Sequence, residues 1–213
     1  MNNEFDENVL SIGNYPFQIK GSPITTLAPT LTYRYFPRLS SLLRNLGLIA
    51  AGSLLLALLA QLSLPLPFTP VPLTGQTFGV LLVGAALGSR RGAYSLILYV
   101  LEGVLGLPFF AGGASGWHVL SGATAGYLFG FVVAAYVIGL LAERGLERTL
   151  RTSFVPFLAG TLVIYLFGVA WLALVLGSLG RAIIAGLLPF LIGDLIKLIL
   201  AALALPAAWK LAK

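Results

Sequence analysis

The chain has 213 residues, of which 58% are hydrophobic and only 9% are charged, and its net charge is +6 at pH 7. A soluble domain carries about 25% charged residues. This composition, with a mean hydropathy of +0.96, therefore excludes an ordinary soluble protein and predicts a membrane protein. The chain contains no cysteine and a single histidine, so we expect no disulfide, no metal site and no bound cofactor.

The first 40 residues are predicted to form a polar and largely irregular extension. This segment contains four prolines and has no continuous apolar run, which excludes a cleaved signal peptide. Residues 41–213 are predicted to form one transmembrane domain.

The apolar residues of that domain come in blocks of about twenty, the length at which a helix crosses a hydrocarbon core of about 30 Å. No stretch shows the ten-residue alternation of a transmembrane barrel, so the predicted fold class is all-α. We expect six transmembrane helices, over residues 42–62, 77–88, 92–107, 126–145, 154–177 and 183–209. The second is too short to span alone unless the loop before it is also folded into the membrane.

The basic residues fall almost entirely on one side of this predicted topology. The opposite side holds only Arg181. The basic side collects Arg34, Arg38, Arg44, Arg90, Arg91, Arg144, Arg148, Arg151, Lys210 and Lys213. Because cytoplasmic flanks are enriched in Lys and Arg, both termini are predicted to be cytoplasmic, in a multi-pass protein of the bacterial cell membrane. Basic residues spread over four separate flanks are topology anchors, so we expect no nucleic-acid partner.

Two long connections on the predicted outer side, residues 63–76 and 107–121, contain no Asp, Glu, Lys or Arg but are rich in proline, glycine and aromatic residues. Exposed loops are normally hydrophilic. This composition predicts loops that fold back over the helices as a lid on a pocket that opens outward. The alternative is that they lie in the membrane interface as aromatic belts.

Asp194 and Lys197 interrupt the last apolar block in its outer half. Their spacing of three places them on one face of a helix, within reach of each other and of a shared ligand. Each charge costs about 2.5–3.5 kcal/mol near the centre of a membrane helix, so such residues normally face a cavity and have a function. The pair predicts binding of a small organic anion with amide-like donors. The alternative is a self-neutralising pair that only joins helices.

Further polar and aromatic side chains are predicted near this pocket. The candidates are Thr69, Thr74, Gln76, Tyr127 and Tyr165, with Trp171 as a flat apolar wall. Glu102, near the outer end of the third helix, is predicted to be a solvated charge at the rim.

Four ordered segments carry a resemblance to a known family. They are FTPVPLTGQTFGVLLVGAALGSRRGAYS (68–95), GLPFFAGGASGWHVLSGATAGYLFGF (106–131), GVAWL (168–172) and GDLIK (193–197). Together they resemble the BioY family, the biotin-binding S components of energy-coupling-factor (ECF) transporters. The resemblance covers about residues 45–210. It implies six helices, an outward-facing biotin pocket capped by two loops, and docking on a transmembrane T protein driven by two ATPase subunits.

The same resemblance assigns roles to individual residues. It implies that Asp194 binds the ureido N–H groups of biotin and that Lys197 binds the valerate carboxylate, although the reverse use of the lysine stays open. Other positions that match the family's motifs are Pro72, Thr74, Gln76, Gly112, Gly113, Gly126 and Tyr127. The chain departs from the family pattern at Ala114, Ala123 and Ala125, all within or next to the second long loop.

S components of this class resemble one another in using small residues four apart on the first helix to meet the T protein, a spacing that suits close approach of helices in lipid. The chain offers two such pairs, Gly47 with Ala51 and Ser53 with Ala57.

Two other functions are compatible with parts of the sequence. Gly113 to Gly116 match the GxSG pattern of rhomboid-type intramembrane proteases, but the single histidine, His118, lies in the same loop rather than on a facing helix. An S component for another vitamin, or a transporter acting alone, is the second alternative. The chain has no phosphate-binding loop of the Walker type, so we expect a transporter subunit without ATPase activity of its own and not an enzyme.

Overall fold

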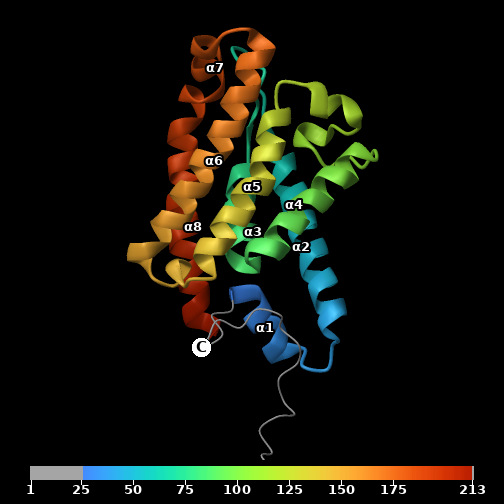
Figure 1. Ribbon diagram of the computed structural model, residues 1–213, viewed down its shortest axis with the longest axis vertical. Coiled ribbons are helices and arrows are strands. Elements are labelled where there is room, and N and C mark those ends of the chain that lie inside the picture. The colour runs from blue at the N-terminus through green and yellow to red at the C-terminus, as the bar shows by residue number, and fades with distance from the viewer. Residues whose placement is uncertain (1–25, 213) are drawn as a thin grey trace, which may run out of the picture.

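In the computed structural model, which describes residues 26–212, the chain is an elongated bundle of helices (Figure 1). A short antiparallel pair of strands, with Ser63 opposite Thr74, closes the first long loop. The α-helices are α1 (Leu27–Tyr35), α2 (Ser41–Gln61), α3 (Gln76–Leu87), α4 (Ser89–Val104), α5 (Ala125–Ala142), α6 (Leu150–Leu176), α7 (Leu179–Gly186) and α8 (Leu191–Ala212). The strands are β1 (Ser63–Leu64) and β2 (Leu73–Thr74), and the 3-10 turns are η2 (Ala111–Gly113), η3 (Trp117–Ser121), η4 (Leu146–Arg148) and η5 (Leu188–Phe190).

Four helical runs within residues 26–212 are long and apolar enough to cross a membrane. They are Ser41–Gln61, Ala125–Ala142, Leu150–Leu176 and Leu179–Leu211, the last of which joins α7 to α8. Many large apolar side chains on these helices face outward, with Leu58 and Leu174 70% and 78% exposed. Such outward surfaces suit lipid contact, because lipid tails are as apolar as leucine. The chain is therefore a multi-pass helical membrane protein.

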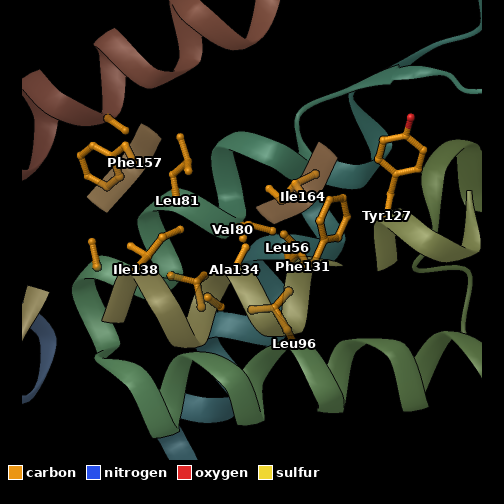
Figure 2. Packing of buried hydrophobic residues seen from close by; sticks show 14 of the residues in the cluster. Leu56, Val80, Leu81, Leu96, Tyr127, Phe131, Ala134, Ile138, Phe157 and Ile164 are labelled. Carbon is orange, nitrogen blue, oxygen red and sulfur yellow. The ribbon is translucent and has the colours of Figure 1, made fainter. Parts of the chain in front are cut away.

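α5 lies at the centre of the bundle and contacts α3, α4 and α6 (Figure 1). Small residues allow these helices to approach closely. At Gly139, for example, an added Cβ would lie 2.2 Å from the backbone nitrogen of Ser89. Figure 2 shows the core that results, in which Leu81, Ile138 and Phe157 pack together from three different helices.

α3 and α4 are joined by a tight turn at Gly88, whose φ of 87° is a conformation that side chains disfavour. The carboxylate of Glu143 provides a hydrogen-bond acceptor for this turn. Its Oε1 accepts from the backbone N–H and from the hydroxyl of Ser89, both at 2.8 Å. At 1.5 Å per residue the 12 residues of α3 cover about 18 Å. The second predicted helix is thus short, as expected, and the loop before it continues inward to the buried Val71.

Two predicted elements differ from the structure. Within the extension predicted to be irregular, residues 1–25 lie outside the described residues, but Leu27–Tyr35 form α1, which packs on α3, α8 and α2 through the buried Leu27 and Pro29. The last predicted helix is not continuous, because the chain breaks between α7 and α8. Pro189 explains the break, since it lacks the N–H of a helical residue and restricts the residue before it.

Candidate ligand-binding site

A cavity of about 310 Å³ lies beneath the two uncharged loops, between the 63–76 loop, the 107–121 loop, the N-terminal turns of α3, α5 and α8, and the middle of α6. Its walls are mostly apolar, and a few polar groups lie among them. The apolar walls include Val71, Phe110, Val119, Leu128, Phe131, Ile164 and Phe190. The polar and titratable groups are Thr74, Gln76, Thr77, His118, Thr124, Tyr127, Tyr165, Asp194 and Lys197.

The polar centre of the cavity is built on Asp194 and Lys197. Their charged atoms, Oδ1 and Nζ, are 2.8 Å apart. The hydroxyl of Thr77 bridges them, accepting from Nζ at 2.9 Å and donating to Oδ1 at 2.9 Å. The other carboxylate oxygen, Oδ2, accepts a hydrogen bond from Tyr165 at 2.6 Å. Both carboxylate oxygens and the ammonium group thus have partners, as buried charges require.

The break between α7 and α8 places this pair at the cavity. α8 begins at Leu191, so Asp194 lies in its first turn. The positive end of the helix dipole stabilises a carboxylate at that position. Asp194 is 6% exposed, and the Lys197 side chain is 18% exposed. The two residues bond to each other, as the self-neutralising alternative expects, but they line a cavity rather than a closed seam between helices.

A second group of hydrogen bonds surrounds Gln76, the residue before Thr77 in the chain. The side-chain Nε2 of Gln76 donates to the hydroxyl of Tyr99 at 2.8 Å, and Oε1 accepts from the hydroxyl of Thr74 at 3.1 Å. Gln76 is 6% exposed and lines the cavity. Tyr127 also lines the cavity, and its hydroxyl donates to the carbonyl of Gly186 at 2.7 Å, which holds the end of α7 against α5.

Six predicted site residues therefore meet at this cavity, and two do not. Gly113 is exposed on the η2 turn, where its φ is 77°. Trp171 lines an apolar groove on the outer surface of α4, α5 and α6. Its Nε1 donates to the carbonyl of Gly122, a cavity residue, at 2.9 Å, so Trp171 supports the wall from behind. The six residues that line the cavity are Thr74, Gln76, Tyr127, Tyr165, Asp194 and Lys197.

Two further predictions about polar residues need correction. The hydroxyl of Thr69 donates to the carbonyl of Ala185 at 2.7 Å and ties the first loop to α7, outside the cavity lining. Glu102 is not a solvated rim charge, because its carboxylate accepts a hydrogen bond from the Ser53 hydroxyl across the contact between α2 and α4. A hydrogen bond between two helices satisfies both polar groups.

Sequence reasoning missed Thr77 and Tyr99. Thr77 follows Gln76 directly at the start of α3, so the sequence TGQT already contains it. Tyr99 is not part of any motif identified in the sequence. Only the structure shows that its hydroxyl, on α4, bonds to Gln76.

The residues predicted to dock a partner lie on different surfaces of α2. Gly47 and Ala51 are exposed, and no atom of the part of the chain that the structure describes lies within 4 Å of a Cβ added at Gly47. Ser53 and Ala57 are 0% and 5% exposed. They pack inside the bundle and are not accessible to a partner.

A helical membrane bundle with a small cavity, polar at its centre and covered by two uncharged loops, defines a membrane protein built to bind a small ligand. The family model that matches the chain, over residues 27–213, is that of the BioY family. The chain belongs to the BioY family.

Relatives support the same assignment. The chain is 42% identical over 160 residues to the biotin transporter BioY of Thermotoga maritima, covering 73% of this chain and 91% of the relative. It is 38% identical over 164 residues to that of Rhizobium etli, covering 74% and 87%. The crystal structure of the S component for biotin from an ECF-type ABC transporter has the same fold, with a TM-score of 0.73 and 24% identity over 81% of this chain and 95% of that one.

Proposed function

We propose that this protein is the S component of an ECF-type transporter, which captures biotin from outside the cell and delivers it to the cytoplasm. The observation that carries the proposal is the Asp194–Lys197 pair facing a cavity within a family of biotin transporters. A cavity of about 310 Å³ is at the small end of the range for ligand sites, about 300–1,000 Å³. That size suits one vitamin molecule.

The geometry favours one way of holding biotin over another. Because Nζ of Lys197 and Oδ1 of Asp194 are 2.8 Å apart, the two side chains serve the same end of a ligand. The ureido ring of biotin presents N–H donors beside a carbonyl acceptor, while its carboxylate lies at the far end of the valerate chain. We therefore assign the ureido N–H groups to Asp194 and the ureido oxygen to Lys197. This differs from the role implied by the family resemblance, in which Lys197 binds the valerate carboxylate.

The rest of the cavity suits the remainder of the molecule. The bicyclic ring and the valerate chain are apolar, and Phe110, Phe131 and Phe190 supply apolar walls. The carboxylate then extends toward the 107–121 loop, where His118 is exposed at the cavity edge. Charge-assisted bonds at the ureido end contribute more than neutral ones would.

The transport step in this proposal depends on partners. All six predicted spans cross the plasma membrane, with α7 and α8 together forming the sixth and both termini in the cytoplasm. The exposed Gly47 and Ala51 dock on a T component, and two ATPase subunits supply the energy. Consistent with this orientation, α1 and the C-terminal end of α8 lie together at one end of the bundle, whereas α7 with Arg181 lies at the other (Figure 1).

Equilibrium binding of radiolabelled biotin to the purified protein tests the site. Asp194→Asn and Lys197→Ala should each weaken biotin by at least about 1.5 kcal/mol, because each removes a charge-assisted bond in a buried setting. Biotin methyl ester separates the two assignments. If Lys197 binds the ureido oxygen, Lys197→Ala weakens biotin and its methyl ester equally.

Leu162→Ala, which alters an exposed side chain on α6 away from the cavity, is the matched control and should leave affinity unchanged. Thermal unfolding of each variant checks that the bundle is intact. Wild-type affinity in both Asp194→Asn and Lys197→Ala would refute the site. If Lys197→Ala weakens biotin but not its methyl ester, Lys197 binds the carboxylate of biotin and not the ureido oxygen.

A further inference from the structure

Tyr99 lies on α4 behind the cavity and is fully buried. Its hydroxyl makes two hydrogen bonds: it accepts from Nε2 of Gln76 at 2.8 Å and donates to the carbonyl of Phe109 at 3.1 Å. Gln76 belongs to the cavity, and Phe109 belongs to the 107–121 loop above it. One hydroxyl therefore joins a ligand-facing side chain to a covering loop.

A group that can only donate and a group that can only accept lie at the two ends of this set of hydrogen bonds. At one end the backbone N–H of Gln76, which can only donate, bonds to Oγ1 of Thr74 at 3.2 Å. The hydroxyl of Thr74 keeps its own proton, which it donates to Oε1 of Gln76. At the other end the carbonyl of Phe109, which can only accept, takes the proton of Tyr99. Tyr99 can therefore only accept from Gln76, and the amide must present Nε2 to it.

We infer that Tyr99 is a positioning residue that fixes the orientation of the Gln76 amide and links that amide to the 107–121 loop. The fixed orientation leaves one N–H and one lone pair of Gln76 for a ligand, at defined places. A flipped amide would exchange donor and acceptor and would mismatch a ligand that fits the first arrangement. Tyr99 is thus a determinant of which ligand polar groups the site accepts.

The packing around Tyr99 supports a positioning role for the loop as well. The ring of Phe110 meets the ring of Tyr99 edge to face, with centroids 5.6 Å apart and planes at 86°. Phe110 is 2% exposed and lines the cavity. Tyr99 therefore holds the loop through the carbonyl of one residue and the ring of the next.

A second side chain holds the same loop without touching Gln76. At the end of α2, the two N–H groups of Gln61 Nε2 are shared between the carbonyl of Ala57, at 3.0 Å, and the loop carbonyls of Pro108, Phe109 and Phe110, at 3.2–3.4 Å. Gln61 anchors the loop to the bundle, whereas Tyr99 anchors it to the ligand site. The two variants Gln61→Met and Tyr99→Phe therefore separate simple anchoring of the loop from its link to the ligand site.

The first test needs no ligand. The chain contains three glutamines, Gln18, Gln61 and Gln76, so selective ¹⁵N labelling of glutamine side chains gives few NMR signals, and Gln76→Met assigns the relevant pair. In the wild type, one N–H of Gln76 should exchange slowly with water. In Tyr99→Phe, which keeps the buried ring, both N–H signals should shift and exchange faster. Unchanged Gln76 signals would overturn the inference.

The second test rests on the proposed function and measures biotin binding and hydrogen exchange of the 107–116 backbone. Tyr99→Phe should weaken biotin roughly two- to tenfold, the usual loss for one hydrogen bond, mainly through faster dissociation. It should also reduce the extra protection that biotin gives to the loop. Gln61→Met should speed loop exchange with and without biotin but keep the protection that biotin adds.

Ser153→Ala is the matched control, because it removes a buried hydroxyl that donates to the carbonyl of Ala202, remote from the loops. It should change neither the Gln76 signals nor biotin release. Failure of the wild type to bind biotin would refute the proposed function, and the NMR test would still decide the role of Tyr99. Wild-type dissociation and loop protection in Tyr99→Phe would reject the link to the loop.

Discussion

Glu147 lies in η4, between α5 and α6, and its side chain is fully buried. One carboxylate oxygen, Oε1, accepts a hydrogen bond from Nε1 of Trp209 at 3.0 Å and lies 3.8 Å from Nε of Arg148. The other oxygen, Oε2, has no hydrogen-bond partner among residues 26–212. Burial therefore raises the pKa of Glu147 above its ordinary value, and the contributions of Arg148 and Trp209 only partly oppose it.

This raised pKa predicts how stability depends on pH. Because the folded protein holds the proton of Glu147 more tightly than the unfolded chain does, the stabilisation is present below the ordinary pKa of glutamate. It is lost as pH rises through the raised pKa. Glu147→Gln removes this contribution. The melting temperature of the wild type, relative to the variant, should therefore fall as pH rises above about 4.5, the ordinary pKa of glutamate, measured in detergent by thermal unfolding.

Arg148→Gln is a useful comparison for the Glu147 prediction. It removes the cation stacked 4.5 Å over the Trp209 ring but leaves the carboxylate in place. The downward slope with pH should persist or steepen, because a favourable charge for ionised Glu147 is gone. Parallel curves for the wild type and Glu147→Gln would contradict the buried-carboxylate explanation.

At the level of single residues, the sequence predicted that the charged pair lies at a binding site. A charged side chain in an apolar helix costs free energy, so its presence indicates a function. Asp194 and Lys197 do meet at a cavity. Tyr99 and Trp171 had no comparable signal. A tyrosine or tryptophan in a membrane helix is ordinary, and whether its polar atom turns toward a cavity or supports its wall depends on contacts between helices.

Among the helices, the contact of α5 with the turn between α3 and α4 is unusually close. A Cβ added at Gly139 would lie 2.2–2.4 Å from backbone atoms of Gly88 and Ser89. A backbone cannot rotate away as a side chain can. Gly139→Ala should therefore destabilise the protein by about 1–3 kcal/mol through overpacking, although alanine favours a helix over glycine by about 1 kcal/mol.

Gly47→Ala is the matched control for this prediction. Gly47 is also in a helix, but none of the described residues has an atom within 4 Å of an added Cβ. This variant should be as stable as the wild type or more stable by up to about 1 kcal/mol. Unfolding of both variants in the same detergent checks the pair. Equal stability of Gly139→Ala and the wild type would show that the turn moves without cost.

Element boundaries followed from the sequence where apolar runs end at polar or glycine residues. The predicted limits of α2, α3 and α4 agree with the structure to within about three residues. α1 could not be predicted in this way, because its nine residues lack a continuous apolar run and gain stability by packing beneath α3 and α8. The α7–α8 break was hidden by unbroken hydrophobicity across Pro189.

For the whole molecule, the proposed docking surface on α2 gives a test of assembly. Gly47→Leu with Ala51→Leu adds bulk to an exposed stripe of small residues, where a partner helix would need close approach. Co-purification with the T component and ATPase subunits should fall at least tenfold. Biotin affinity of the isolated protein should not change, because the stripe is outside the cavity lining.

Ala170→Leu, at an exposed position on α6, makes the same kind of change on another surface and should leave the complex intact. Equal co-purification of the α2 double variant and the wild type would reject docking through Gly47 and Ala51. Equal loss in both variants would point to a general effect of added bulk.

The sequence alone did not predict how the helices are arranged around one another. Hydrophobicity marks a segment as membrane-spanning but does not say which neighbour it contacts, because lipid and protein offer similar apolar surroundings. The central position of α5 follows from its buried small residues, such as Ala134 and Ala135. Only the set of close contacts in the structure distinguishes them from small residues like Gly47 on a free surface.

The pairing of Lys197 with Asp194 also has an electrical consequence. Moving one elementary charge across the membrane potential involves about 2.3 kcal/mol per 100 mV. Because these two charges are opposite and 2.8 Å apart, together they contribute almost no gating charge. If the empty subunit reorients in the bilayer, the voltage does little work on this pair, whereas a bound carboxylate would add one negative charge to the moving body.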